Sequence, residues 1–198
     1  MKTVIIKYNA GNIFSVDYAL KRLGVEAEIT GDREKIKAAD KVIFPGVGEA
    51  ATTMTYLRQH KLDELIRDLK QPVLGICIGM QLMCKSSEEG GNTACLGIFD
   101  EEVKLLTPTK TVNKVPHVGW NTVRYADSPL FRGLPQDSYF YFVHSYYATQ
   151  GQHTVATTHY IQDYSVALQK DNFYALQFHP EKSGTIGELV LKNFLEIK

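Results

Sequence analysis

The sequence has few cysteines, and their spacing does not suit cross-linking. Its 198 residues hold three, Cys77, Cys84 and Cys95, an odd number without a C-x-x-C pair. A disulfide-stabilised domain needs a denser, even set, and a structural zinc site needs closely spaced pairs of ligands. The composition therefore argues against both, and we expect no metal and no cofactor.

An excess of charge of one sign and long apolar runs are also missing. Lys+Arg and Asp+Glu number 22 each, and no basic run is longer than a pair. Nucleic-acid and anionic membrane surfaces need a basic excess, so neither partner is expected. Near the N-terminus the continuous apolar run is only Val4-Ile5-Ile6, too short for a signal peptide or a membrane span. We expect a cytoplasmic protein with one domain over residues 1–198, because 44% hydrophobic content at this length supplies one large core.

Short strand-like runs alternate with helical patterns in the first half of the chain. Strands are expected at residues 3–6, 25–29, 41–44 and 73–76. Between them, helical spacing predicts one helix from Asn12 to Gly24 and another through residues 54–69 that is broken around residues 59–61. This alternation predicts an α/β fold with an open, largely parallel, flavodoxin-like sheet flanked by helices. Ligands should bind at the carboxyl ends of its strands, where residues 8–12, 45–48 and Cys77 lie.

The second half of the chain is rich in strands. They are expected at residues 103–106, 118–125, 139–144, 154–158, 165–168 and 173–178. A capping box from Thr185 to Glu188 predicts the start of a C-terminal helix that continues to Ile197.

The segment around Cys77 has the spacing of a nucleophile elbow. Gly75-x-Cys77-x-Gly79 follows a buried strand, and glycines on both sides let a strand fold back tightly into a helix. The first turn of that helix favours a thiolate and offers N–H groups to an oxyanion, one of them from the elbow itself. On spacing alone, Cys77 remains open to the alternative of an apolar core cysteine. Cys84 is expected to pack in the core two turns along the same helix.

A cysteine nucleophile needs a base, and the six histidines are the candidates. His60, His153 and His159 lie in charged or Gln/Thr-rich stretches that suit structural or solvated roles. His179 differs because it ends an apolar strand and precedes Pro180, which favours an extended backbone. In such a backbone Glu181 points to the same side and can orient the imidazole. A surface pair of His179 and Glu181 is the alternative.

Together these segments resemble the class I glutamine amidotransferases, whose triad is Cys, His and Glu in that chain order. The nucleophile segment is Gly75-Ile76-Cys77-Ile78-Gly79-Met80-Gln81-Leu82, and the other triad segment runs from Gln177 to Ser183. Residues 45–48, 114–121 and 142–146 are similar to one branch of that family, the glutaminase subunits of imidazole glycerol phosphate synthases. The resemblance spans nearly the whole chain.

The resemblance implies roles for residues beyond the triad of Cys77, His179 and Glu181. The oxyanion would be stabilised by N–H groups of Val47, Gly48 and Ile78. The substrate, L-glutamine, would be bound by Gly46, Gln81, His144, Ser145 and Tyr146. For His144, a packed strand histidine is the alternative.

The resemblance also implies a separate heterodimer partner, a (β/α)₈-barrel cyclase subunit, that receives ammonia through a channel. Asn12, Trp120 and Lys182 would lie at the interface. Lys7, Asn9 and Glu49 depart from the usual pattern of the branch and bear on that interface, not on the triad.

Three other functions remain open at this stage. One is a paralogous subunit that feeds a different synthase, one is a non-catalytic flavodoxin-like module, and one is another thiol hydrolase.

Overall fold

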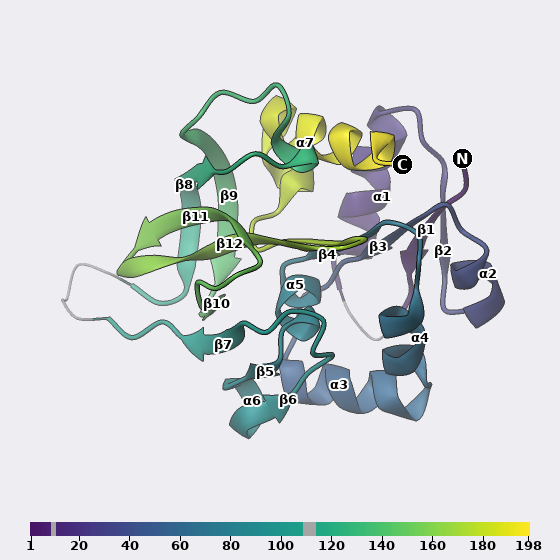
Figure 1. Cartoon of the computed structure of the whole chain (residues 1–198), viewed down its shortest axis with the longest axis horizontal. Helices are drawn as coiled ribbons and strands as arrows, with labels where there is room; N and C mark the ends of the chain where they lie inside the picture. Colours follow the sequence, from purple (N-terminus) through teal and green to yellow (C-terminus); the bar gives the residue numbers. More distant parts are fainter. Residues whose placement is uncertain (9–10, 109–113) are drawn as a thin grey trace.

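The computed structural model describes residues 1–8, 11–108 and 114–198 (Figure 1). Residues 9 and 10 of the predicted turn at 8–12, Asn9 among them, lie outside this part. Within the described ranges no helix has both the length and the hydropathy to cross a membrane.

The N-terminal half of the sheet is parallel. Its order is β2-β1-β3-β4-β13, and every neighbouring pair in this run is parallel. The five strands are β1 (Thr3–Ile6), β2 (Ala27–Thr30), β3 (Lys41–Phe44), β4 (Val73–Ile76) and β13 (Phe173–Leu176). The predicted α/β fold with a flavodoxin-like parallel sheet is confirmed for this half, because its five strands are parallel and most of them are linked through helices.

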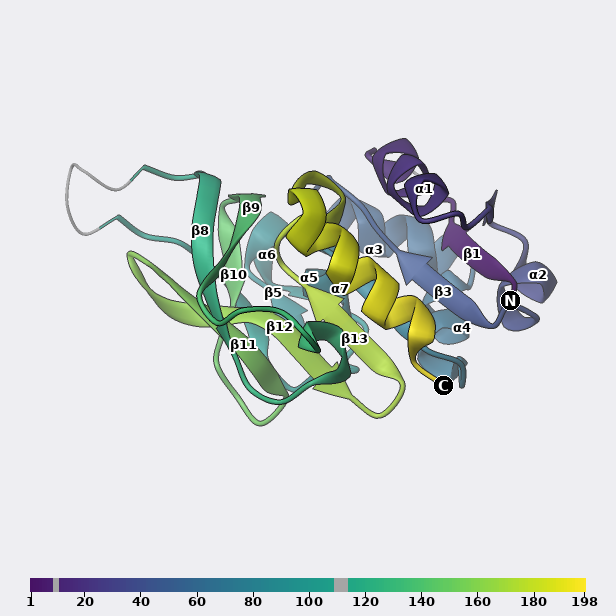
Figure 2. The same cartoon turned by 90° about the horizontal axis from the view of Figure 1, so that it is seen from above.

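Helices cover both faces of the parallel strands, and each face has its own core. Ile5, Ile43 and Leu74 pack against α1 (Ile13–Arg22) and α7 (Gly184–Glu196), which lie across one face in Figure 2. The alternate residues Val4, Val42 and Val73 pack on the other face. The helices there are α2 (Arg33–Lys37), α3 (Ala50–Gln59), α4 (Leu62–Asp68) and α5 (Ile78–Met83). This two-faced burial explains why the inner strands β1, β3 and β4 are mainly apolar, whereas the edge strand β2 is half-buried and carries Glu28.

The strand-rich half extends the sheet in a mainly antiparallel manner. From β13 it continues through β12, β10, β7, β5 and β6, while β11, β8 and β9 branch from β12 as a second layer. The strands are β5 (Ser86–Ser87), β6 (Thr93–Ala94), β7 (Glu102–Leu105), β8 (His117–Tyr125), β9 (Ser138–His144), β10 (Tyr146–Ala148), β11 (Thr154–Tyr160) and β12 (Gln162–Lys170). Short helical segments are α6 (Glu89–Asn92), η1 (Pro129–Phe131) and η2 (Pro180–Lys182).

Several local predictions need correction. The break at residues 60–61 is confirmed, with Lys61 in a left-handed conformation between α3 and α4. The capping box is wrong, because α7 begins at Gly184 with Ser183 at its N-cap. Within the described part of the chain Ser183 makes no side-chain capping bond either, since its hydroxyl accepts from the Tyr141 N–H and donates to the His179 carbonyl oxygen. Helix α5 ends at Met83, so Cys84 lies just after it rather than on it, although it is fully buried as expected.

Strand β3 and helix α5 approach so closely that only glycine fits at the contact. A Cβ atom on Gly79 would lie 1.9 Å from the carbonyl oxygen of Phe44. Because the obstacle is backbone, it cannot rotate away. This contact fixes where α5 begins relative to the sheet, and with it the residue just before the helix.

Replacing Gly79 with alanine should therefore destabilise the protein strongly. Overpacking against rigid backbone costs about 3 kcal/mol or more, which lowers Tm by roughly 6 °C or more in a thermal melt. Gly24→Ala is the matched control, since Gly24 has φ 75° but open space around it, so the expected cost is only about 1 kcal/mol. Equal losses in the two variants would contradict the proposed constraint.

Candidate active site

Cys77 forms the corner between β4 and α5 with φ 56° and ψ −110°, a backbone conformation that non-glycine residues rarely adopt. Such strain costs about 1–3 kcal/mol and persists where the surroundings impose it. The Cys77 N–H donates to the Leu176 carbonyl oxygen at 2.8 Å, and a Cβ on Gly75 would contact the Gly79 backbone at 3.0 Å. The structure thus has the predicted elbow geometry.

His179 follows β13, the strand next to β4, and its backbone is held on both sides. Its N–H donates to the Tyr141 carbonyl oxygen at 2.9 Å, and its own carbonyl oxygen accepts the Ser183 hydroxyl at 2.7 Å. His179 is extended, with φ −98° and ψ 95°. The predicted extended path through Glu181 is wrong, because Glu181 lies in the 3₁₀ turn η2. The two side chains still meet, with His179 Nδ1 2.7 Å from Glu181 Oε1.

Asn12 adds a contact that the sequence did not indicate. It stands at the N-cap of α1, but its side chain makes no capping bond among the described residues. Instead, Asn12 Nδ2 donates to Glu181 Oε1 at 2.7 Å and lies 3.4 Å from His179 Nδ1. Two donors therefore converge on one carboxylate oxygen, which fixes the orientation of the Glu181 side chain.

His179 is buried, and its Nε2 atom has no hydrogen-bond partner among the described residues. Burial alone lowers its pKa, but the interactions with Cys77 and Glu181 outweigh burial and raise the pKa to about 10. An imidazole in this state stabilises a neighbouring thiolate. Nδ1 is engaged by Glu181, so Nε2 is the nitrogen left for proton transfer.

A pocket of about 210 Å³ opens beside the thiol. Seven of the predicted oxyanion and substrate residues line it together with Cys77: Val47, Gly48, Ile78, Gln81, His144, Ser145 and Tyr146. The structure thus brings residues from distant segments of the chain to one cavity, whereas Gly46 does not line it.

Gly46 contacts Tyr8 instead. A Cβ on Gly46 would lie 1.9 Å from Tyr8 Oη, and that hydroxyl donates to the Pro45 carbonyl oxygen at 2.6 Å. The absence of a side chain at Gly46 lets the turn after β3 lie against this buried tyrosine.

The side chains of Gln81 and His144 form hydrogen bonds with other groups of the protein. Gln81 Nε2 donates to the carbonyl oxygens of Tyr146, at 2.8 Å, and of the Gln177 side chain, at 2.9 Å. His144 Nδ1 lies 2.8 Å from the same Tyr146 oxygen. Burial and the neighbouring His117 lower the pKa of His144 to about 3, so the ring is neutral. Both residues therefore shape the pocket wall through the Tyr146 carbonyl.

Glu89 also lines the pocket, and sequence reasoning missed it. Its Oε2 accepts the Ala50 N–H at 2.8 Å, and burial raises the pKa of its carboxyl group. The run Glu88-Glu89-Gly90-Gly91 resembles an ordinary acidic turn, so no signal separated Glu89 from its neighbours. In the structure it is an acidic group at a mainly uncharged cavity.

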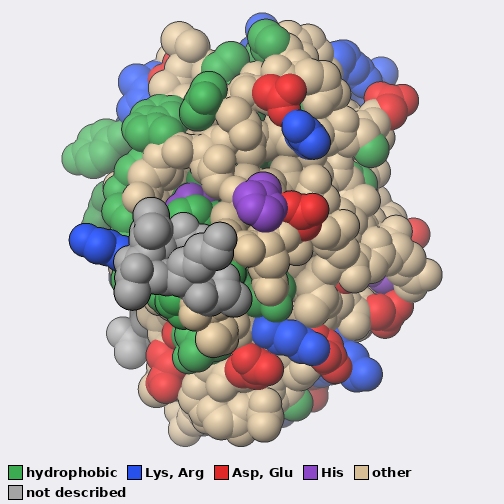
Figure 3. Space-filling model, turned by 90° about the vertical axis from the view of Figure 1, so that its left-hand side faces the viewer, with side chains coloured by type: hydrophobic (Ala, Val, Ile, Leu, Met, Phe, Trp, Pro, Cys, Tyr) green, Lys and Arg blue, Asp and Glu red, His purple; other side chains and the backbone are tan. Residues whose placement is uncertain are grey.

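Two of the predicted interface residues lie around one tyrosine. Trp120 on β8 is 55% exposed and contacts Tyr141 edge-on, with ring centroids 6.1 Å apart. Lys182 Nζ lies 5.9 Å from the centroid of the same ring. Val118 and Tyr139 are exposed on the same two strands, and hydrophobic side chains gather along the left edge of the face in Figure 3.

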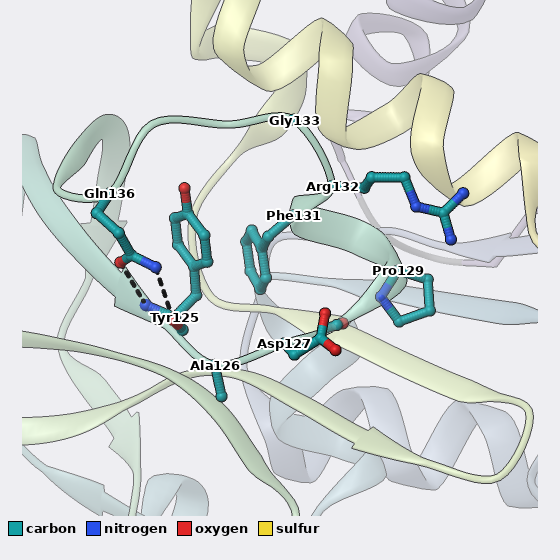
Figure 4. Close-up of a pocket in the computed structure, with 9 residues that line it drawn as sticks. Tyr125, Ala126, Asp127, Pro129, Phe131, Arg132, Gly133 and Gln136 are labelled. Carbon is teal, nitrogen blue, oxygen red and sulfur yellow. Dashed lines mark hydrogen bonds between the residues drawn. The ribbon is translucent and has the colours of Figure 1, made fainter.

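A second pocket, of about 580 Å³, lies around η1 in the strand-rich half. In Figure 4 the rings of Tyr125 and Phe131 stack face to face, and the Gln136 amide bonds the backbone of Tyr125. No cysteine or histidine lines this pocket. Of these two pockets, only the smaller one is lined by the nucleophile Cys77, which interacts with His179.

Comparison with known proteins identifies the family of the chain. Residues 4–197 match the family described as "Glutamine amidotransferase class-I". The chain is 64% identical to the "Imidazole glycerol phosphate synthase subunit HisH" of Bacteroides fragilis (strain YCH46), with 100% of each chain covered. The protein with the same name from Yersinia pseudotuberculosis is 46% identical, again over 100% of each chain.

Two solved structures share the fold. One, described as "Crystal structure of glutamine amidotransferase", superposes with a TM-score of 0.75 at 22% identity and covers 98% of this chain and 97% of its own. The other is a glutamine amidotransferase from Thermotoga maritima, with a TM-score of 0.65, 16% identity, and coverage of 99% and 81%. On the family match and the full-length identities to the curated relatives, the chain belongs to the class I glutamine amidotransferase family.

Proposed function

We propose that this chain is the glutaminase subunit of an imidazole glycerol phosphate synthase, an enzyme of histidine biosynthesis. It would hydrolyse L-glutamine to glutamate and ammonia through a cysteinyl thioester. The observation that carries the proposal is the arrangement of Cys77 on a strained corner beside His179, with a pocket at the thiol. The full-length identity to relatives that carry this name supports the assignment to that synthase.

The triad supplies each proton that the reaction needs. The Cys77 thiolate attacks the side-chain amide carbon of glutamine, while His179 holds the thiol proton. The tetrahedral intermediate collapses, the C–N bond breaks, and His179 gives its proton to the departing nitrogen, which leaves as ammonia. A water molecule, deprotonated by His179, then cleaves the thioester to glutamate and restores the thiol. Glu181 and Asn12 keep the imidazole oriented throughout.

Backbone N–H groups would stabilise the oxyanion. The Ile78 N–H belongs to the first turn of α5, where N–H groups have no helical partner. Val47 and Gly48 also line the pocket, and Gly48 has φ 145°, a conformation open to glycine. A turn of this kind can rotate its peptide groups at low cost. We therefore assign the second donor to the turn at residues 46–48.

The far end of the pocket suits the amino acid end of glutamine. The backbone of Ser145 and Tyr146 would bind the α-carboxylate, and the Glu89 carboxylate would bind the α-ammonium group. Gly46, Gln81 and His144 would act through the shape of the turn and the wall rather than by direct contact.

The ammonia would pass to a second chain. Ammonia released into neutral water is protonated and loses its nucleophilicity, so a protected channel to the acceptor is needed. We propose that the heterodimer partner is a (β/α)₈-barrel cyclase subunit, whose lyase reaction uses the ammonia to form imidazole glycerol phosphate and AICAR. Trp120 and Lys182 around Tyr141, with Asn12, would lie at the interface. A chain that serves a different synthase is the alternative.

The proposal predicts that Cys77→Ala abolishes glutamine hydrolysis, while Cys84→Ala keeps most of it. Cys84 is fully buried and burial raises the pKa of its thiol, so it cannot replace the nucleophile. Glutamate release is measured with and without the cyclase subunit of the same organism and its nucleotide substrate. A glutamine-analogue electrophile should label Cys77 alone by peptide mass spectrometry. Stoichiometric labelling of Cys84 or Cys95 would remove Cys77 from this role.

Glu181→Gln should lower kcat less than His179→Ala does. The amide oxygen can still accept bonds from His179 and Asn12, but it cannot stabilise the imidazolium charge. Loss of the base should cost about 10²–10⁴-fold in the partner-activated complex. Stopped assays of glutamate formation give both values, and full activity of both variants would show that the triad is wrongly assigned.

Val47→Pro should depress activated turnover by about 10²-fold or more, because it removes one N–H from the proposed oxyanion turn. Cys77 should keep its reactivity toward a small alkylating agent, since the elbow is untouched. Alkylation that falls in parallel with turnover would indicate a disrupted elbow instead. Full activation of the variant by the partner would exclude the Val47 N–H as donor.

A further inference from the structure

Three buried polar side chains form a chain of hydrogen bonds behind the pocket wall. His117 Nδ1 lies 3.0 Å from Tyr164 Oη, and Tyr164 Oη lies 3.2 Å from His144 Nε2. They come from β8, β12 and β9, and His117 is paired directly with His144 in the β8–β9 register. Of the three, only His144 lines the pocket at the thiol, so the proton transfers of the triad leave Tyr164 and His117 without a role.

The chemistry of the groups sets the direction of every bond. The Tyr146 carbonyl oxygen can only accept, so His144 Nδ1 carries the hydrogen of their 2.8 Å bond. Burial keeps His144 neutral, with its pKa lowered to about 3, so its Nε2 must accept from the Tyr164 hydroxyl. The Tyr164 oxygen then accepts from His117 Nδ1–H, and burial likewise lowers the pKa of His117 to about 4. The donors and acceptors are thus assigned consistently for every hydrogen bond from His117 to the Tyr146 carbonyl.

This chain ends on the carbonyl that Gln81 also holds. Tyr146 O receives His144 Nδ1–H and Gln81 Nε2–H, both at 2.8 Å. Gln81 continues to Gln177, whose Nε2 lies 3.9 Å from Cys77 Sγ. The pocket wall at Ser145 and Tyr146 is thus fixed by donors from two sides. A buried polar group without a hydrogen-bond partner lowers the stability of the folded state. We therefore expect that the loss of one member of this network disturbs the others.

The other end of the chain reaches the first residue of β8. The His117 ring is stacked between Tyr160, with centroids 3.9 Å apart, and Phe142, at 4.9 Å. It therefore cannot turn away to find another partner. Trp120, three residues further along the same strand, belongs to the proposed interface. One hydrogen-bond network therefore connects β8, which carries the proposed contact with the cyclase, to the wall of the glutamine pocket.

We propose that Tyr164 and His117 are positioning residues for L-glutamine: they orient His144, and through it the Ser145–Tyr146 wall that binds the amino acid end of the substrate. The inference rests on the proposed glutaminase function. Because the wall holds the substrate equally before and during reaction, its loss changes KM rather than kcat.

The test uses Tyr164→Phe in complex with the cyclase subunit of the same organism. KM for L-glutamine should rise about tenfold, as expected for one lost buried hydrogen bond, with kcat within about twofold. Tyr125→Phe is the matched control, since it loses a hydroxyl that donates to the Leu134 carbonyl oxygen, outside the pocket. It should keep the wild-type KM. An equal rise in both variants would show a general loss of packing and overturn the proposal.

Substitutions at His117 give an independent measure if Tyr164→Phe does not fold. His117→Leu removes the donor and should raise KM in the same way. His117→Asn keeps an N–H at the position of Nδ1 and should restore a KM close to that of the wild type. The same KM for the leucine and asparagine variants would overturn the role of the donor.

The tautomers of His117 and His144 can be measured by NMR spectroscopy without an activity assay. Long-range ¹H–¹⁵N spectra of the ¹⁵N-histidine-labelled chain should show Nδ1–H tautomers for His117 and His144, and His117 should shift toward Nε2–H in Tyr164→Phe. An Nε2–H tautomer of His144 in the wild type would exclude the network. A wild-type complex without glutaminase activity would remove the proposed function but leave these spectra unchanged. In an active complex, an unchanged KM in Tyr164→Phe and His117→Leu would overturn only the inference.

Discussion

The parallel pairing of β4 with β13 is the constraint on which the site depends. The register sets Ile76 opposite Leu176, and the Cys77 N–H then bonds the Leu176 carbonyl oxygen. The nucleophile and the base are far apart in the chain, yet they leave the sheet at the same edge, one and three residues after this pair. A register shift of one residue would turn every side chain of β13 to the other face. The two cores on the faces of the sheet prevent such a shift, so packing far from the thiol fixes the distance between the reacting groups.

The parts of the fold that could be predicted are those set by local pattern. Strands β1, β3 and β4 and the elbow follow from apolar runs and glycines that are close together in sequence, and the break at residues 60–61 follows from the polar run Gln59-His60-Lys61. The capping box at Thr185 and the extended path through Glu181 failed because residues 180–183 form a tight turn whose serine is bonded to β9 and to His179. The hydrogen bond from Tyr141 to Ser183 joins distant segments, so local propensity did not indicate it.

In the candidate site, too, the residues in local motifs could be predicted, whereas their distant partners could not. Cys77, His179 and Glu181 stand in recognisable motifs, but the bond from Asn12 joins positions 169 residues apart, and the acceptor of Tyr164 is 20 residues away on another strand. Asn12 looked like a helix cap and Glu89 like a surface acid. Only the folded chain shows that the amides of Gln81 and Asn12 are directed inward, where each donates to an oxygen that a histidine also contacts. Polar partners of this kind follow from tertiary packing, which no local window contains.

The placement of the two cysteines of the elbow segment has a chemical consequence. Cys77 packs with the core on one face of the sheet and Cys84 with the core on the other. Seven positions along a mostly helical path separate their Cα atoms by about 10 Å, beyond the span of a disulfide. An oxidised Cys77 could therefore not be captured by its nearest cysteine in sequence without local unfolding. A sulfenic acid at Cys77 would therefore stay available to thiols from solution rather than form a disulfide with Cys84.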